Sequence, residues 1–211
     1  MKKFLKARRE FSPSRGVKLR PVFTTQVVKV LGSESLIEYL SDKTPSFYRD
    51  FIKLSEDLKD GFYISSFKQT LARLPNHEHF QSSHFGEISA SVFVEEVLGI
   101  KKIYSKLSLN TTENQNAYKM DLVCFVPGSD PMEFVFCEVK SSNKHKEDGF
   151  PAGHDKSCYA DIFNSLKKYD KVDLDFDLTA IKDNLDSILE PDRTNIRKSL
   201  VPYSQRKIKY K

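Results

Sequence analysis

Residues 132–142 have the sequence MEFVFCEVKSS, and this stretch decides the fold that the sequence predicts. Side chains alternate between the two faces of a β-strand, so Glu138 and Lys140 share one face. Both faces are apolar as far as Phe136, which predicts a central strand buried on both sides. A carboxylate and an ammonium at the end of such a strand are costly to desolvate unless each has a partner. The charged pair therefore needs an explanation.

The composition is that of a globular protein with one sizeable core. The chain has 211 residues, 39% of them hydrophobic, with 16 Phe and 9 Tyr. No apolar run approaches the roughly 18 residues of a membrane span, and the basic start MKKFLKARRE lacks the apolar segment of a signal peptide. Three cysteines without CxxC spacing indicate a reduced, cytoplasmic chain, in which Cys124 and Cys137 are core residues.

The net charge of +5 conceals basic ends on an acidic body. Residues 1–20 hold eight Lys or Arg against Glu10, and residues 193–211 hold seven with no acid. Each end therefore carries +7, and the rest of the chain carries −9. This segregation favours a polyanion or an acidic protein as a partner at the termini, although solvated tails would have the same composition.

The order of predicted elements indicates a mixed α/β core with a small sheet. Residues 1–24 are expected to be irregular, 25–31 to form a strand, and 33–74 to be helical. Ser82 or Ser83 is expected to cap a helix that stops at Gly99. The remaining predicted elements are three strands, Lys102–Leu109, Ala117–Val126 and Met132–Ser141, the last two joined by a PGSDP turn, and two helices, Ser157–Tyr169 and Leu178–Leu189.

Three segments are expected from this order. Residues 1–81 form a basic segment and a helical region, and residues 82–172 form the core. Residues 173–211 form a helical and basic C-terminal segment that packs with the core as one compact unit.

Two further acidic residues are hard to explain by solvation. Asp121 begins the apolar run of YKMDLVCFV, where an aspartate is a poor strand former. Glu87 lies in the predicted helix about 60° from the centre of its apolar stripe, at about 100° of turn per residue. Glu95 and Glu96 of the same helix fall on the solvent side. Only Glu87 among these three glutamates is placed to point into the core.

Carboxylates that converge at the end of a sheet suit a hard divalent cation, most naturally Mg²⁺, with Mn²⁺ also possible. We therefore expect Glu87, Asp121 and Glu138 to be metal ligands, and Asp121, Glu138 and Lys140 to be catalytic. Such a metal lowers the pKa of a bound water, and Lys140 would orient or deprotonate that water and stabilise the same negative charge. This combination suits phosphodiester hydrolysis.

These residues resemble the PD-(D/E)xK nuclease superfamily. Gly86-Glu87 opens a helix, Asp121 lies on a strand, and Glu138-Val139-Lys140 lies on the next strand, over roughly residues 82–170. Met120 stands where the superfamily name has a proline. The resemblance implies a restriction-endonuclease-like core with a small mixed sheet flanked by helices.

More narrowly, the chain resembles the HamA family, the nuclease subunits of the Hachiman anti-phage defence system. That resemblance implies a helicase partner of superfamily 2, HamB-like, which restrains the nuclease until aberrant DNA is sensed. DNA is then degraded with little sequence preference.

Less specific interpretations stay open at this point. Glu-x-Lys pairs are common as solvated strand neighbours, and a glutamate in the first turn of a helix is favoured by the helix dipole. The alternative function is a non-catalytic subunit with a nuclease-like fold that binds nucleic acid or the helicase. Histidines are weaker candidates: His77 and His79 suit a polar loop, His84 lies one turn before Glu87, and His145 and His154 fall in the polar loop after the active strand.

Overall fold

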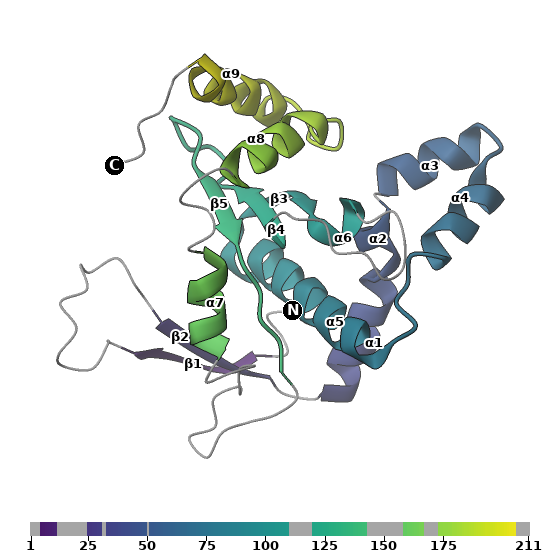
Figure 1. The fold of residues 1–211 in the computed structure, drawn as a ribbon. Coiled ribbons are helices and arrows are strands. Elements are labelled where there is room, and N and C mark those ends of the chain that lie inside the picture. The colour runs from purple at the N-terminus through teal and green to yellow at the C-terminus, as the bar shows by residue number, and fades with distance from the viewer. Residues whose placement is uncertain are drawn as a thin grey trace. The chain divides into compact units, whose positions relative to one another are not determined.

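A computed structural model describes residues 5–11, 25–30, 33–49, 51–109, 120–142, 158–166 and 173–205 (Figure 1). The chain divides into two compact units, Met1–Asp42 and Lys43–Lys211. The predicted boundaries at residues 82 and 173 stay a prediction.

The smaller unit contains a β-hairpin and the helix α1 (Ser33–Lys43), which ends at the unit boundary. Strand β1 (Leu5–Phe11) pairs antiparallel with β2 (Thr25–Val30). The strand predicted at 25–31 is thus confirmed, but the expectation that all of residues 1–24 are irregular is wrong. In LKARREF the polar Lys6, Arg8 and Glu10 alternate with other residues, but Arg9 interrupts the apolar face, and the strand pairs with β2.

The larger unit is organised around an antiparallel sheet of order β3-β4-β5. Its strands are β3 (Lys101–Ser105), β4 (Leu122–Phe125) and β5 (Phe134–Cys137). The predicted central strand was misassigned, because β4 lies in the middle and is fully buried, whereas β5 lies at an edge and is half-buried. The strands are also shorter than predicted. Asp121 immediately precedes β4, and Glu138 and Lys140 follow β5.

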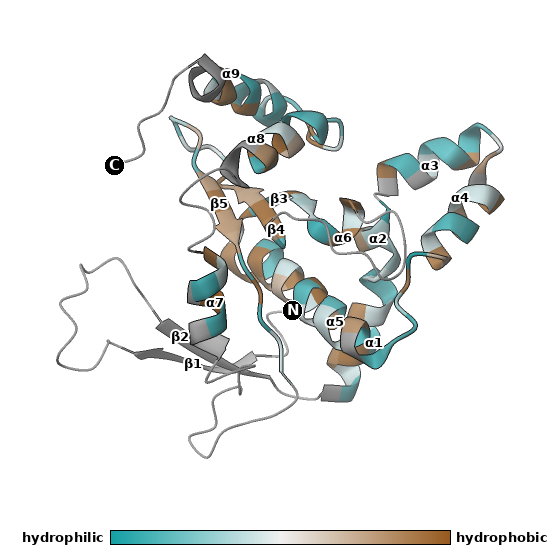
Figure 2. Ribbon diagram, viewed as in Figure 1, coloured by the Kyte–Doolittle hydropathy of each residue, from teal (hydrophilic) through white to brown (hydrophobic). Residues whose placement is uncertain are grey.

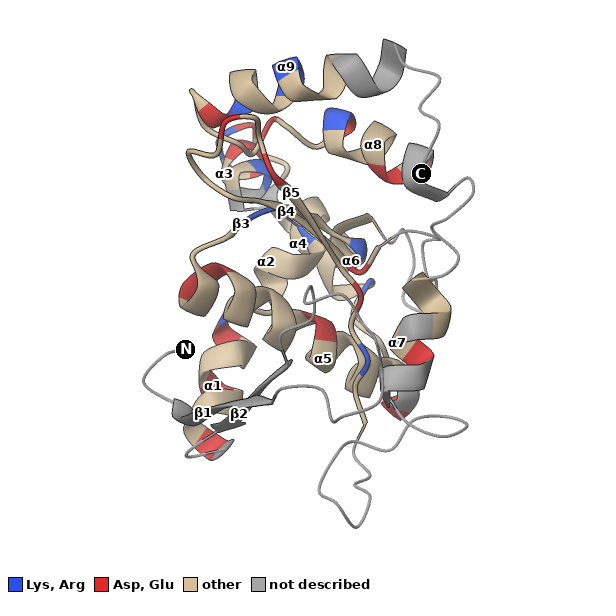
Figure 3. Ribbon diagram, turned by 90° about the vertical axis from the view of Figure 1, so that its left-hand side faces the viewer, with Lys and Arg blue, Asp and Glu red and all other residues tan. Residues whose placement is uncertain are grey.

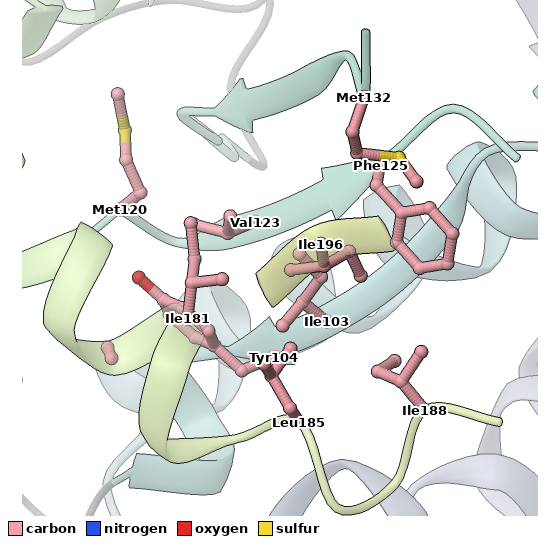
Figure 4. Close-up of a cluster of buried hydrophobic side chains, with 11 residues drawn as sticks. Ile103, Tyr104, Met120, Val123, Phe125, Met132, Ile181, Leu185, Ile188 and Ile196 are labelled. Atoms are coloured by element: carbon pink, nitrogen blue, oxygen red, sulfur yellow. The ribbon is translucent and has the colours of Figure 1, made fainter. Parts of the chain in front are cut away.

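Helices cover both faces of this sheet, so the larger unit has three layers (Figures 1 and 2). On one face, Val123 and Phe125 of β4 pack against α8 (Asp173–Asp183), α9 (Asp192–Gln205) and the link between them, as Figure 4 shows. On the other face, Leu122 and Cys124 pack against Val94. Strict alternation along β4 therefore divides its side chains between two apolar clusters. The mixed α/β class with a small sheet is confirmed.

The helix before the sheet differs at its start from the prediction and agrees at its end. It comprises α5 (Glu78–Phe93) and a π-helical turn, η2 (Val94–Leu98). It begins after His77, whose backbone is extended, so neither Ser82 nor Ser83 caps it. Gly99 ends it with φ of 74°, a left-handed conformation that favours glycine.

The other helices mostly follow the predicted order with different bounds. A single turn, α6 (Lys106–Leu109), replaces the second half of the first predicted core strand. Two helices, α8 and α9, replace the one predicted at 178–189, and α9 was missed because its sequence is strongly polar. No helix within the described ranges is long and apolar enough to cross a membrane. The remaining helices are α2 (Pro45–Tyr48), α3 (Phe51–Lys59), α4 (Tyr63–Leu71) and α7 (Cys158–Leu166).

A buried carboxylate connects α8 to the sheet. Asp177 is fully buried, and its Oδ1 accepts hydrogen bonds from the Tyr104 hydroxyl and, at 3.3 Å, from the Met120 backbone N–H. A buried carboxylate without such donors is strongly unfavourable. The two bonds therefore stabilise the contact between α8 and the sheet.

We expect Tyr104→Phe to lower the free energy of unfolding by about 1–3 kcal/mol, because it removes a donor from a buried carboxylate. Denaturant unfolding measures the change. The double variant with Asp177→Leu should lose less than the sum of the two single variants, since it removes both partners. Unchanged stability of Tyr104→Phe would contradict this account.

Candidate active site

Strand register brings the candidate residues together at one end of the sheet. Leu122 of β4 pairs with Ser105 of β3 on one side and with Cys137 of β5 on the other. Asp121, one residue earlier, therefore lies between the continuations of both neighbouring strands. The Lys106 backbone N–H donates to the Asp121 carbonyl oxygen at 2.9 Å, which extends the β3–β4 pairing by one residue.

The Asp121 side chain is held from both sides. Its Oδ1 lies 3.1 Å from Lys106 Nζ, and its Oδ2 accepts a hydrogen bond of 2.8 Å from the Val139 backbone N–H. Asp121 is only 5% exposed, so both contacts are shielded from water. The carboxylate is thereby fixed against the Glu138–Lys140 segment, as the sequence predicted.

Glu138 and Lys140 form a direct ion pair. Lys140 Nζ lies 2.6 Å from Glu138 Oε1. The Lys140 side chain is 31% exposed and that of Glu138 is 10% exposed. Burial alone would lower the pKa of Lys140, but the hydrogen bond and charge of Glu138, with the charges of Asp121 and Asp161, raise it above its ordinary value. Lys140 is therefore a cation at neutral pH, and it stays accessible to solvent.

Glu87 points into the same cluster from α5. It is 6% exposed, which confirms that it faces inward, and its Oε2 has no hydrogen-bond partner in the described part of the chain. Burial first, and then the charges of Asp121 and Glu138, raise its pKa to about 8, although the two lysines oppose this shift. Acidic and basic stretches of chain thus meet near α5, α6 and the end of β5 (Figure 3).

A glycine allows α5 to lie directly against the chain that follows β5. A Cβ atom at Gly86 would stand 2.6 Å from the Ser141 Cβ and 2.9 Å from its Oγ, which is closer than side chains tolerate. The Ser141 hydroxyl donates to the Ser82 carbonyl oxygen at 3.1 Å. This close approach brings Glu87 toward Glu138 and Lys140.

A buried histidine and tyrosine lie beside Glu87. His84 Nδ1 and the Tyr48 hydroxyl are 2.6 Å apart, and His84 Nε2 has no partner among the described residues. Burial, and then the charge of Lys106, lower the pKa of His84 to about 4, so the imidazole is neutral at pH 7. Burial, and then Glu87, raise the pKa of Tyr48, so its hydroxyl keeps its proton. His84 thus lies near the cluster, a position that the sequence suggested without committing to it.

Sequence reasoning missed three members of this environment: Lys106, Tyr48 and Asp161. Lys106 had a usable signal, since it follows an apolar strand at the same end as Asp121. The other two come from helices whose place beside the site depends on the tertiary fold. Among the remaining histidines His77 is exposed, and the side chains of His79, His145 and His154 lie outside the described residues.

The donor set suits a hard cation chemically, since Glu87, Asp121 and Glu138 all offer carboxylate oxygens and one Glu87 oxygen lacks a partner. The two lysines balance the negative charges of the other two carboxylates: Lys106 pairs with Asp121, and Lys140 pairs with Glu138. No group of three or more His, Cys, Asp or Glu in the described ranges is arranged to hold a metal ion. A bound cation would therefore require these side chains to turn toward one point.

One comparison with known proteins gives a match. A family model described as HamA matches residues 2–211, which is nearly the whole chain. No curated protein matches, and no solved structure matches. The narrower resemblance stated from Glu87, Asp121, Glu138 and Lys140 is confirmed at the level of the family. The wider resemblance to the PD-(D/E)xK superfamily stays a proposal.

We expect Gly86→Ala to destabilise the protein by about 1–3 kcal/mol, because the new methyl group overlaps the Ser141 side chain. Denaturant unfolding measures the loss. In the double variant Gly86→Ala/Ser141→Gly the overlapping side chain is gone, so part of the stability should return. If the second change rescues nothing, the contact does not limit the approach of α5.

The raised pKa of Glu87 predicts a pH-dependent effect of Glu87→Gln. The native Glu87 carboxyl stays protonated up to about pH 8, whereas the unfolded one ionises near its ordinary pKa of 4.5. Ionisation thus favours unfolding, and wild-type stability falls as the pH rises between these values. The stability of Glu87→Gln relative to wild type should therefore rise from pH 5 to pH 8, measured by denaturant unfolding in EDTA. A constant difference would contradict burial of this carboxyl.

Proposed function

The chain belongs to the HamA family, and from this premise we propose that it is a metal-dependent DNA nuclease, the effector subunit of a Hachiman anti-phage defence complex. Family membership supports the assignment to a Hachiman defence component. The observation that carries the nuclease proposal is the cluster at the end of the sheet. There, three acids and two lysines from separate segments influence one another's charge, and the buried Glu87 Oε2 has no hydrogen-bond partner among the described residues.

We also propose that residues 82–172 form a restriction-endonuclease-like core. A helix that carries Glu87 packs on an antiparallel sheet, Asp121 immediately precedes the central strand, and Glu138 and Lys140 follow the next one. This arrangement supports the PD-(D/E)xK assignment that the sequence spacing suggested. Met120 at the position of the motif's proline is buried and gives its backbone N–H to Asp177, so it serves the fold.

The proposed metal is Mg²⁺, or Mn²⁺, held by Glu87, Asp121 and Glu138. When bound, it lowers the pKa of a water and offsets charge on the pentacovalent phosphate. The unpartnered Glu87 oxygen supports this assignment, because a nearby cation would compensate a carboxylate that burial and two acidic neighbours destabilise.

The two lysines have different proposed roles. Lys140 is cationic and 31% exposed at its side chain, so it binds the scissile phosphate and stabilises its charge, and it does not act as the base that removes a proton from water. Lys106 is less exposed and is bound to Asp121, so it is a positioning residue that fixes this carboxylate. The same lysine also limits repulsion between Asp121 and Glu87.

The further proposals concern the setting of the nuclease. Family membership supports a partner within the Hachiman complex. We propose that this partner is a HamB-like helicase of superfamily 2 that restrains the nuclease in the cytoplasm. The substrate is DNA, cut with little sequence preference, which fits a site whose described polar groups suit a phosphate.

One observation favours the alternative of a non-catalytic nucleic-acid- or helicase-binding subunit. Glu138 and Lys140 already satisfy each other at 2.6 Å, as a structural ion pair would. The solvent exposure of Lys140 and the unpartnered Glu87 oxygen weigh against it.

The nuclease proposal predicts that wild-type protein cleaves plasmid DNA with Mg²⁺, and that Glu138→Ala and Lys140→Ala each lose at least about 100-fold in rate. Gel electrophoresis measures cleavage, and unfolding curves check that each variant folds. Glu133→Ala is the matched control, because Glu133 is exposed beside β5 and outside the cluster. The subunit must be tested free of its helicase partner as well as with it.

A binding measurement separates the metal from the activity. Mg²⁺ should raise the unfolding temperature of the wild type at pH 8, and the increase should be smaller in Asp121→Asn and Glu87→Gln. Cleavage that persists in Glu138→Ala would remove the proposed role of this residue. A folded wild type that neither binds Mg²⁺ nor cuts DNA would favour the non-catalytic alternative.

A further inference from the structure

A second polar pocket lies in the larger unit, lined by residues of α2, β3 and the link between α8 and α9, together with Lys53 and Arg73. Its volume is about 250 Å³. None of the acidic residues of the candidate active site lines it. Four cations line the pocket, Arg49, Lys53, Arg73 and Lys102, and among the described lining residues only Asp186 is acidic.

Two of these cations are already compensated. Arg49 donates through Nε to Asp57 Oδ2 at 2.8 Å, an interaction that neutralises much of its charge. Lys102 Nζ lies 3.9 Å from Glu95 Oε2 and 4.2 Å from the centre of the Phe47 ring. These two residues shape the pocket, and the charge available to a ligand comes from the other two.

Arg73 and Lys53 supply that charge. Arg73 donates through Nη1 to the Tyr48 carbonyl oxygen at 3.0 Å, a neutral partner that leaves its charge in place. Burial, and then the positive charge of Arg49, lower the pKa of the Arg73 guanidinium, although it remains protonated at pH 7. Lys53 has no acidic partner in the part of the chain that is described. An anion in the pocket would relieve repulsion between the two arginines.

A buried hydroxyl group in the same wall supplies a second, independent observation. Ser105 lines the pocket and is 3% exposed, yet its Oγ has no hydrogen-bond partner in the described ranges. Buried polar groups are nearly always paired, so an unpaired one in a pocket wall leaves a hydrogen bond for a ligand or a water to make. A donor hydroxyl in the wall of a pocket that guanidinium and ammonium groups also line suits phosphate oxygens.

We propose that this pocket binds the phosphate group of a nucleotide, either free or within a DNA strand. Its volume is below the roughly 300–1,000 Å³ of pockets that hold drug-sized ligands, so it accommodates a phosphate with its attached sugar. Arg73 and Lys53 provide the charge, and Ser105 donates a hydrogen bond. This site goes beyond the proposed nuclease centre and does not depend on it, because phosphate binding here needs no metal.

Titration calorimetry in EDTA tests the proposal with the full chain. We expect deoxyadenosine monophosphate to bind at least about tenfold more tightly than deoxyadenosine, since only the monophosphate carries the recognised group. Lys53→Gln should weaken this binding several-fold. Lys59→Gln is the matched control, because Lys59 is exposed on the same helix and does not line the pocket. Ser105→Ala should also weaken binding, with folding checked by thermal unfolding.

Oligonucleotides distinguish the source of the phosphate. A four-residue deoxyadenosine oligonucleotide is compared with and without a 5′-phosphate. Dependence on the 5′-phosphate indicates a strand end, equal binding of both indicates the backbone, and binding of the monophosphate alone indicates a free nucleotide. Each of these three outcomes supports a phosphate site if Lys53→Gln weakens binding of the probe more than Lys59→Gln does. If no probe distinguishes these two variants, the proposal is overturned.

Discussion

The strand register that fixes Asp121 between β3 and β5 is the constraint on which the rest of the larger unit depends. Lys106 and Val139 each bond one oxygen of this carboxylate, so the three strands are cross-linked at the end where the charged residues gather. Strand β4 itself divides its side chains between two helical layers. The sheet is therefore anchored by packing along its length and by charge at one end.

Much of this core could be predicted from the sequence, because its signals are local. The apolar runs before Val126 and around Phe134 indicated two adjacent strands, and Gly99 marked the end of the helix before them. The inward face of Glu87 followed from helical periodicity alone. Glu87 lies close enough to Asp121 and Glu138 for their charges to raise its pKa, because α5 and the ends of β4 and β5 meet there.

The parts that could not be predicted depend on contacts between distant segments. Lys106 joins the site through strand register, and Tyr48 joins it through a hydrogen bond to His84, 36 residues later. The strand at Leu5–Phe11 has only a weak alternating pattern, interrupted at Arg9, and it pairs with β2. Strand β5 was predicted to be central because Phe134 and Phe136 are apolar. In the structure it lies at an edge of the sheet, and both side chains are only half-buried.

The contact between Gly86 and Ser141 also bears on how related sequences diverge. A residue without a side chain at position 86 permits a side chain at position 141, and the reverse exchange would preserve the same spacing between helix and chain. Change at either position alone is disfavoured. In relatives that keep this spacing, positions 86 and 141, which are 55 residues apart, should therefore vary as a pair. Such covariation would show that the close packing of the helix on this segment is shared within the family.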